Sequence, residues 1–257
     1  MQQKVVHAGV HSSSYQQAAR DLNELSDLAI GPKPVERLTK RIGQGRLDQR
    51  DAAVAAFQER PLMEKDTVAE PGRPCPPVAM ASVDGGRLQV RSTATEASAS
   101  ERSSPWRESK VAVLETYQSE VSPTDPDPDV PRCFLDLTRT ARLVRGLGHA
   151  LPGGLEVEGA GPDPTPDEPA APGRDRAARP GRPQRLVRSV LASRACADDF
   201  GPMMHQAAWE RNFFGARRRA FLGDGQAANW TIQQRHFPSF EAILDFVHAL
   251  SSIFAAA

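Results

Sequence analysis

Residues 148–183 constrain the fold more than any other segment, because Pro, Gly, Asp, Glu and Arg dominate them. A stretch this long with so few large apolar side chains buries too little surface to offset the entropy lost on ordering. We therefore predict a disordered insertion here. The remainder of the 257-residue chain is long enough for one or two domains, so the core must come from either side of the insertion.

The first region, residues 1–60, has the apolar periodicity of three short helices. Serines at 12–14 offer N-caps for the first helix. Its apolar face recurs at intervals of three and four residues, at Tyr15, Ala18, Ala19, Leu22 and Leu25. The Gly-Pro pair at 31–32 ends it, and a second helix is expected to end at the glycines at 43 and 45. A third helix is predicted over residues 47–58.

The second of these helices is basic, with Arg37, Lys40 and Arg41 expected to point outward. A helix, a short turn and a basic helix form the layout of a DNA-binding helix-turn-helix. A small helical bundle with a solvated basic face is the alternative. Lys plus Arg and Asp plus Glu both total 32, so the whole-chain charge does not indicate a nucleic-acid binder.

The pattern changes after a proline-rich linker at residues 61–77. Strands are predicted at 78–83, 88–90, 110–117, 186–191, 221–222 and 242–246, and helices within 133–147, at 198–214, at 229–237 and from 248 onward. Strands that alternate with helices indicate an α/β or α+β domain around a central sheet, over residues 78–257.

The cysteines and the apolar runs bear on the compartment of the protein. Cys75, Cys133 and Cys196 form no C-x-x-C pair and are odd in number, so we interpret them as reduced thiols of a cytosolic protein. The N-terminus lacks the apolar core of a signal peptide, and no apolar run approaches the roughly 20 residues of a membrane span. We expect a cytoplasmic protein without a membrane partner.

Two aspartates stand beside glycine next to predicted strands. Asp84 precedes a Gly-Gly pair, and Asp224 lies between two glycines. A carboxylate in such a place lets a metal ion and a phosphate come close to the backbone. The alternative for Asp84 is a β-hairpin turn, which the Asp-Gly dipeptide favours.

A third pattern, D-x-x-H, follows the predicted strand at 242–246. Asp245 and His248 would point to one pocket from the strand end and from the first turn of the next helix. Taken alone, the pattern favours an N-capping Asp245 and a His248 that polar neighbours satisfy.

Four motifs occur in a fixed order: V-D-G-G-R, W-R-E-x-K-V-A-V, F-L-G-D-G-Q-A-x-N-W and I-L-D-F-V-H-A-L. In this order they resemble insertion-sequence DDE transposases. The resemblance is greatest to the bacterial branch akin to Mutator-type enzymes, in which D-x-x-H or C-x-x-H follows the second aspartate. It covers residues 78–257, interrupted by the insertion.

The resemblance implies an RNase H-like domain, with the first aspartate on the first strand and the second at the end of a later strand. Asp84 and Asp224 would then be the catalytic, metal-binding carboxylates, and Asp245 and His248 an accessory pair. The cofactor would be Mg²⁺, with Mn²⁺ as a substitute, in a two-metal displacement at a phosphodiester. The motif from Trp106 to Lys110 matches the family without a catalytic role.

The same resemblance implies double-stranded DNA as the partner, comprising transposon ends and target. The N-terminal helices would bind it, through Arg37, Lys40 and Arg41. A homo-oligomer of the full-length form and association with the nucleoid are further expectations.

The family's third carboxylate, a Glu well downstream of D-x-x-H, has no counterpart before Ala257. The sequence ends in an apolar, helix-like run without a stop signal, which indicates truncation. We therefore expect that residues 1–257 do not catalyse transposition. The competing hypotheses are a DNA-binding protein that keeps the RNase H-like half as a scaffold, and another metal nuclease of the same fold.

Overall fold

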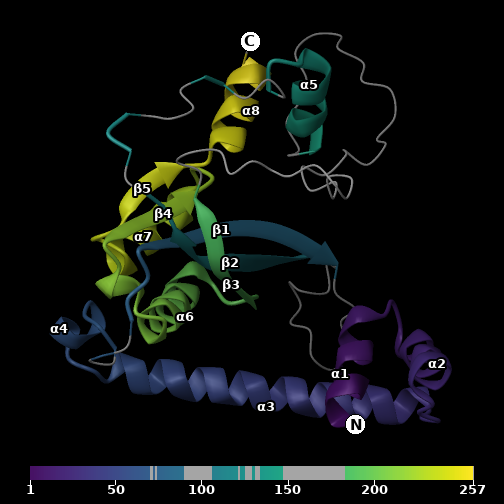
Figure 1. Ribbon diagram of the computed structural model, residues 1–257. Helices are drawn as coiled ribbons and strands as arrows, with labels where there is room; N and C mark the ends of the chain where they lie inside the picture. Colours follow the sequence, from purple (N-terminus) through teal and green to yellow (C-terminus); the bar gives the residue numbers. More distant parts are fainter. Residues whose placement is uncertain are drawn as a thin grey trace, which may run out of the picture. The chain divides into compact units, whose positions relative to one another are not determined.

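The computed structural model describes residues 1–69, 72, 74–89, 106–120, 122–124, 129–130, 134–146 and 183–256. Its helices and strands are α1 (Gln2–His11), α2 (Tyr15–Ser26), α3 (Pro32–Gln58), α4 (Leu62–Lys65), β1 (Val78–Gln89), β2 (Trp106–Gln118), α5 (Leu137–Gly146), β3 (Gln184–Ser193), α6 (Ala197–Glu210), the 3-10 helix η3 (Phe213–Gly215), β4 (Arg218–Gly223), α7 (Ala227–His236), β5 (Glu241–Leu244) and α8 (Phe246–Ala256) (Figure 1). The chain divides into two compact units, Met1–Arg60 and Pro61–Ala257. We call them unit 1 and unit 2.

Unit 1 consists of α1, α2 and α3 packed around a small apolar core. The Ser14 hydroxyl accepts a hydrogen bond from the Gln17 N–H at 3.1 Å and caps α2, as predicted. The core is formed by Val5, Ala18, Ala19, Leu22 and Val35. Three of these residues belong to the face predicted for α2, although Leu25 of that face is exposed. Val5 belongs to α1, a helix that the sequence analysis did not predict.

Helix α3 runs unbroken through Gly43 and Gly45, so the predicted break between a second and a third helix is wrong. A glycine inside a helix costs only about 1 kcal/mol relative to alanine, and no proline follows to remove a backbone donor. The Gln44 side chain donates to Asp48 Oδ1 at 2.8 Å across the turn that contains Gly45. The predicted helical character of this region is confirmed.

Unit 2 is organised around a five-stranded sheet with the order β3-β2-β1-β4-β5. Strands β1, β2 and β3 pair antiparallel, whereas β4 is parallel to β1 and β5 is parallel to β4 (Figure 1). The described residues form a mixed α/β structure, which confirms the predicted fold class. Because β4 is the parallel neighbour of β1, it brings residues far apart in sequence side by side.

Strand β1 is continuous from Val78 to Gln89. The two separate strands and the Asp-Gly hairpin turn considered for this segment are therefore wrong. Strand β2 begins at Trp106, earlier than predicted, and pairs with the second half of β1, with Gly85 opposite Lys110. This partner keeps the chain extended through the glycines, because the ladder hydrogen bonds continue past them.

One face of the sheet carries the main core. Every second residue of β1 points to this face, namely Ala79, Ala81 and Val83, and helices α6 and α7 pack over it. The core is largely aromatic and includes Phe200, Met204, Phe213, Phe214, Phe221, Ile232, Phe237 and Phe240. Burial of this face leaves the opposite face of the same strands for other side chains.

Residues 61–69, the first part of the predicted linker, pack against α6 and the turn that follows it. The Trp209 indole N–H donates to the Glu64 carbonyl at 3.1 Å, and the Ala69 N–H donates to Asn212 Oδ1 at 2.9 Å. Asn212 has a left-handed backbone and is fully buried, so this bond satisfies its side chain. The segment therefore contributes to unit 2.

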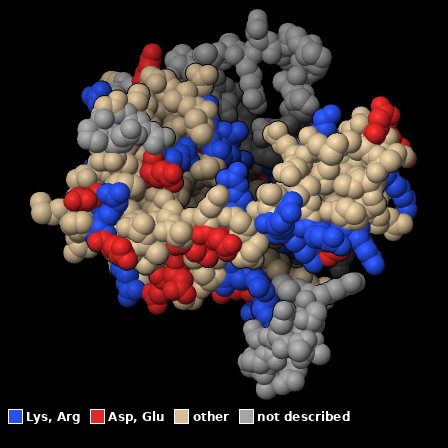
Figure 2. All heavy atoms as spheres, turned by 90° about the horizontal axis from the view of Figure 1, so that it is seen from below, with Lys and Arg blue, Asp and Glu red and all other residues tan. Residues whose placement is uncertain are grey.

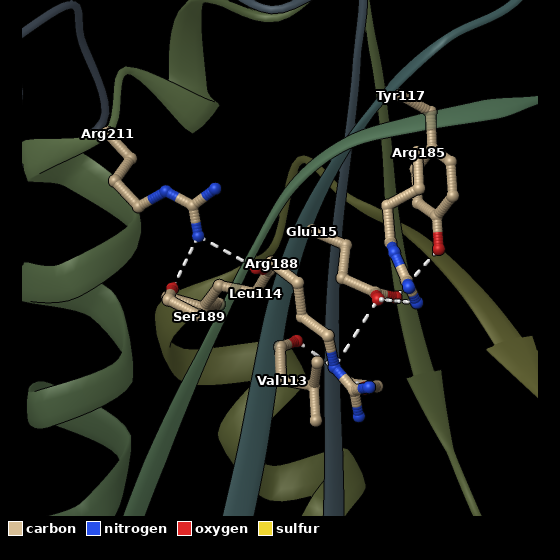
Figure 3. Close-up of polar contacts among 9 residues, drawn as sticks. Val113, Leu114, Glu115, Tyr117, Arg185, Arg188, Ser189 and Arg211 are labelled. Carbon is tan, nitrogen blue, oxygen red and sulfur yellow. Dashed lines mark hydrogen bonds and ion pairs between the residues drawn. The ribbon is translucent and has the colours of Figure 1, made fainter. Parts of the chain in front are cut away.

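Strand β3 is an exposed edge strand, held to β2 by polar contacts (Figure 3). Glu115 of β2 is buried, accepts a hydrogen bond from the Tyr117 hydroxyl at 2.7 Å, and lies 3.3 Å from Arg185 Nη1 and 3.6 Å from Arg188 Nε. Burial, followed by the hydrogen bond to Glu115, raises the pKa of Tyr117 to about 12. We call these four residues the Glu115 cluster.

Helices α5 and α8 lie side by side (Figure 1). Next to them, the rings of Phe134 and Phe246 meet edge to face, with their centroids 5.2 Å apart. None of the described helices combines the length and the apolar character that a membrane span requires. The predicted disordered insertion at 148–183 lies outside the described residues, apart from Pro183.

Candidate metal centre

Asp84 and Asp224 stand where the parallel pairing of β1 and β4 ends. The last pair in register is Val83 with Gly223, so each aspartate is the next residue of its chain segment. Val83 faces the aromatic core, and since side chains alternate along a strand, Asp84 projects from the opposite face. The two carboxylates, about 140 residues apart in sequence, thus lie side by side at one end of the sheet, as predicted.

Asp224 is held in place by the turn that leads into α7. Its Oδ1 accepts hydrogen bonds from the Gln226 N–H at 3.0 Å and from the Asn229 amide at 2.7 Å. Gly225 has a φ of 95°, a conformation that only glycine adopts easily, so this tight turn depends on it. Both hydrogen bonds engage Oδ1, which leaves Oδ2 as the atom that can serve a ligand.

Asn229 is a site residue that the sequence analysis missed. It is 3% exposed, and its amide N–H₂ fixes the Asp224 carboxylate from the first turn of α7. Its place within the G-D-G-Q-A-x-N-W motif was visible in the sequence. The five-residue distance from Asp224, however, becomes a contact only through the turn at Gly225.

Asp245 caps the N-terminus of α8. Its Oδ1 accepts from the N–H groups of Val247 at 2.8 Å and His248 at 3.2 Å, which is the capping alternative considered for this residue. The Asp245 N–H donates to the Gly223 carbonyl at 2.8 Å and ties the start of α8 to the end of β4. The predicted strand at 242–246 ends earlier, at Leu244, because Asp245 begins the cap.

These residues surround a cavity of about 410 Å³ on the face opposite the aromatic core. Its walls are formed by Ser82, Val83, Asp84, Val111, Val113, Leu222, Gly223, Asp224, Asp245 and His248. Three acidic side chains and one histidine therefore converge over an apolar floor. No lysine or arginine lines this cavity in the described part of the chain, so its acidic side chains have no permanently charged basic side chain beside them in the lining.

Asp84, Asp224 and His248 each offer one ligand atom within 4.8 Å of the other two. Ligands at about 2.1 Å from a divalent ion lie at most about 4.2 Å apart, so a small closure would suffice. His248 Nδ1 is buried without a hydrogen-bond partner among the described residues, and it faces Asp245 Oδ1 at 3.5 Å. Oxygen donors, an unsatisfied imidazole and the absence of a local cation together fit a divalent metal.

The other predicted residues lie elsewhere. Arg37, Lys40 and Arg41 are exposed on α3 in unit 1, where Lys40 pairs with Glu36 at 2.6 Å. Lys110, from the W-R-E-x-K motif, is buried on β2 and pairs with Glu108. Since Val111 lines the cavity and side chains alternate along β2, Lys110 projects to the opposite face.

No protein-family model, curated protein or solved structure matches this chain.

Proposed function

We propose that the protein derives from a DDE-type transposase, the class of enzyme that carries out metal-dependent phosphodiester hydrolysis and strand transfer on DNA, and that residues 1–257 are a fragment that does not complete transposition. One observation carries the proposal: Asp84 on the first strand and Asp224 after its parallel neighbour bring their carboxylate oxygens within 4.8 Å. The resemblance to DDE transposases implies the same placement of the two aspartates. The sheet order and the D-x-x-H pair at the same cavity support the RNase H-like assignment.

Asp84 and Asp224 are the residues that would hold Mg²⁺ or Mn²⁺. When bound, such ions polarise the phosphate and activate a water or 3′-hydroxyl. Asn229 and Gln226 keep the Asp224 carboxylate oriented, so its free oxygen stays directed at the cavity. Val111 and Val113 contribute apolar side chains to the lining of the cavity.

DNA binding is assigned to the exposed basic residues of α3. On the face seen in Figure 2, groups of Lys and Arg side chains alternate with acidic ones, in keeping with the zero net charge. Affinity must therefore come from a local stripe, Arg37, Lys40 and Arg41. The logarithm of the binding constant falls linearly with the logarithm of the salt concentration. Replacing all three residues by Gln should make this slope shallower by up to about 0.9 per lost phosphate contact. The matched control is Arg194→Gln, an exposed site in unit 2.

The test of the catalytic assignment is nicking of duplex DNA in Mg²⁺ or Mn²⁺, with joining of a 3′-end scored separately. We expect metal-dependent nicking that Asp84→Asn abolishes and that Asp199→Asn, an exposed control on α6, leaves intact. Nicking that survives in Asp84→Asn would refute the assignment.

The alternative is a DNA-binding protein with unit 2 as a scaffold, which the exposed basic side chains on α3 favour. It predicts DNA binding with no metal-dependent chemistry. Nicking by the wild-type protein that depends on Asp84 would rule it out.

Strand transfer is expected to be absent, because the metal cluster among the described residues contains two carboxylates and no third. Strand transfer by the wild-type protein that is lost in the Asp84→Ala variant would contradict this expectation.

A further inference from the structure

His248 stands apart from the two aspartates in its chemistry. One of its ring nitrogens lies within 4.8 Å of a carboxylate oxygen of both Asp84 and Asp224. The three donors come from three separate elements: β1, the turn after β4, and the first turn of α8. Side chains from independent elements converge in this way when the fold, and not a local turn, places them.

The D-x-x-H spacing puts a carboxylate beside the imidazole. Asp245 Oδ1 lies 3.5 Å from His248 Nδ1, and two backbone N–H groups of α8 hold the Asp245 carboxylate. In metal sites, a histidine that binds an ion with one ring nitrogen commonly turns the other toward a carboxylate, which fixes the ring and makes it a better donor. The aspartate that caps α8 thus also stands beside the His248 ring, although Nδ1 forms no hydrogen bond among the described residues.

We propose that His248 is a direct metal ligand together with Asp84 and Asp224, that Asp245 is the residue that positions its ring, and that the site prefers Mn²⁺ over Mg²⁺. The proposal rests on the proposed function, because it takes the two aspartates as metal ligands. Mg²⁺ binds oxygen donors and keeps several waters, whereas an imidazole nitrogen favours ions of the transition series. Two carboxylates and one imidazole thus give the described residues three donors that suit Mn²⁺.

The competing view is that His248 only supports the N-terminus of α8. In that case its ring would interact with Asp245 alone, and metal affinity would not depend on it. The two views differ in whether a nitrogen is bound to the ion, which can be observed directly.

The experiment measures Mn²⁺ binding to the untagged full chain by electron paramagnetic resonance, with Mg²⁺ added as a competitor. Pulsed measurements on the bound ion report directly coordinated ¹⁴N. We expect Mn²⁺ to bind at least about 10-fold more tightly than Mg²⁺, with a ¹⁴N coupling. His248→Gln should lose the coupling and about 10-fold in Mn²⁺ affinity, while its Mg²⁺ affinity changes by less than about 3-fold. His11→Gln, an exposed site in unit 1, is the control.

The outcomes separate the two proposals. If the ion bound to wild-type protein shows no ¹⁴N coupling, the proposed role of His248 is wrong. Misfolding cannot explain that result, because the measurement uses no variant. If Asp84→Asn and Asp224→Asn still lower Mn²⁺ affinity in that case, the proposed function stands without it. If neither aspartate variant changes metal binding, the proposed function itself fails.

Discussion

Two groups of carboxylates on the same face of one sheet have opposite surroundings. Asp84 pairs in register with Val111. Every second residue of β2 lies on the face of the cavity, which places Val111, Val113 and Glu115 there. Glu115 is 7% exposed and has a tyrosine and two arginines around it, whereas Asp84 and Asp224 meet without a cationic neighbour in the cavity lining. Glu115 has cationic partners, whereas among the described residues Asp84 and Asp224 accept hydrogen bonds from neutral groups only. Under the proposed function, this difference in surroundings distinguishes a structural acid from a metal-binding one.

The largest expected effect comes from Asp224→Asn. Displacing the metal or the phosphate by about 1 Å costs on the order of 10²-fold in rate. The rate of nicking should therefore fall by at least that factor. The free energy of unfolding should fall by at most about 1 kcal/mol, because no ion pair is lost and the new amide oxygen can still accept the hydrogen bonds from Gln226 and Asn229. Nicking kinetics and urea unfolding provide the two measurements. A variant that is strongly destabilised but active would place Asp224 with Glu115, as a structural acid.

Asn229→Ala should have the next largest effect. Loss of the amide that fixes Asp224 should weaken Mn²⁺ binding by about 10-fold, the lower end for residues that orient a ligand. Isothermal titration with Mn²⁺ measures this, and Gln234→Ala, an exposed site on the same helix, serves as the control. Unchanged Mn²⁺ affinity would show that the turn at Gly225 suffices to orient the carboxylate.

Glu115→Gln should have the opposite effects, lowering stability while activity and metal binding stay nearly unchanged. It removes the partner of Arg185 and Arg188, and because both arginines are half exposed, the expected loss is about 1–2 kcal/mol in the free energy of unfolding. Nicking and metal binding should stay within about 2-fold of wild type. Urea unfolding beside the exposed Glu120→Gln variant tests this. A loss of metal binding in Glu115→Gln would break the distinction between the two groups.

The smallest expected effect is a pH dependence that arises in the aromatic core. Burial, together with the neighbouring His205, lowers the pKa of His236 to about 4, from an ordinary value of about 6.5. Between these values the unfolded chain binds the proton and the folded chain does not, so the free energy of unfolding falls as the pH falls from 6.5 to 4. The loss should be about 1 kcal/mol, since the ring is partly exposed.

Urea unfolding at pH 7 and pH 4.5 checks this dependence against His236→Phe. The variant should lose less stability over the same range, whereas His11→Gln should follow the wild type. Identical pH dependence in wild type and His236→Phe would assign the acid sensitivity to other groups.

Sequence reasoning located Asp84, Asp224, Asp245 and His248 because each lies beside a strand end or in a short motif. It placed strand β4 and helix α7 for the same reason. It failed at 84–87 because glycine and aspartate favour turns, yet the early start of β2 at Trp106 kept this segment extended. It failed at Gly43 and Gly45 because a helix tolerates isolated glycines when no proline follows.

Other features could not be predicted from local pattern at all. The Glu115 cluster joins residues 70 positions apart and depends on the register of β2 with β3, which the sequence does not reveal. The role of Asn229 depends on one turn geometry. That His248 adjoins both aspartates follows from β4 and β5 being parallel neighbours.

A crystal of the protein soaked in Mn²⁺ tests the central claim most directly, through the anomalous scattering of the ion. We predict one peak in the cavity, about 2.2 Å from carboxylate oxygens of both Asp84 and Asp224. No peak is expected at Glu115, whose carboxylate is already satisfied by its neighbours. An empty cavity at saturating Mn²⁺, or a peak bound by neither aspartate, would contradict the account.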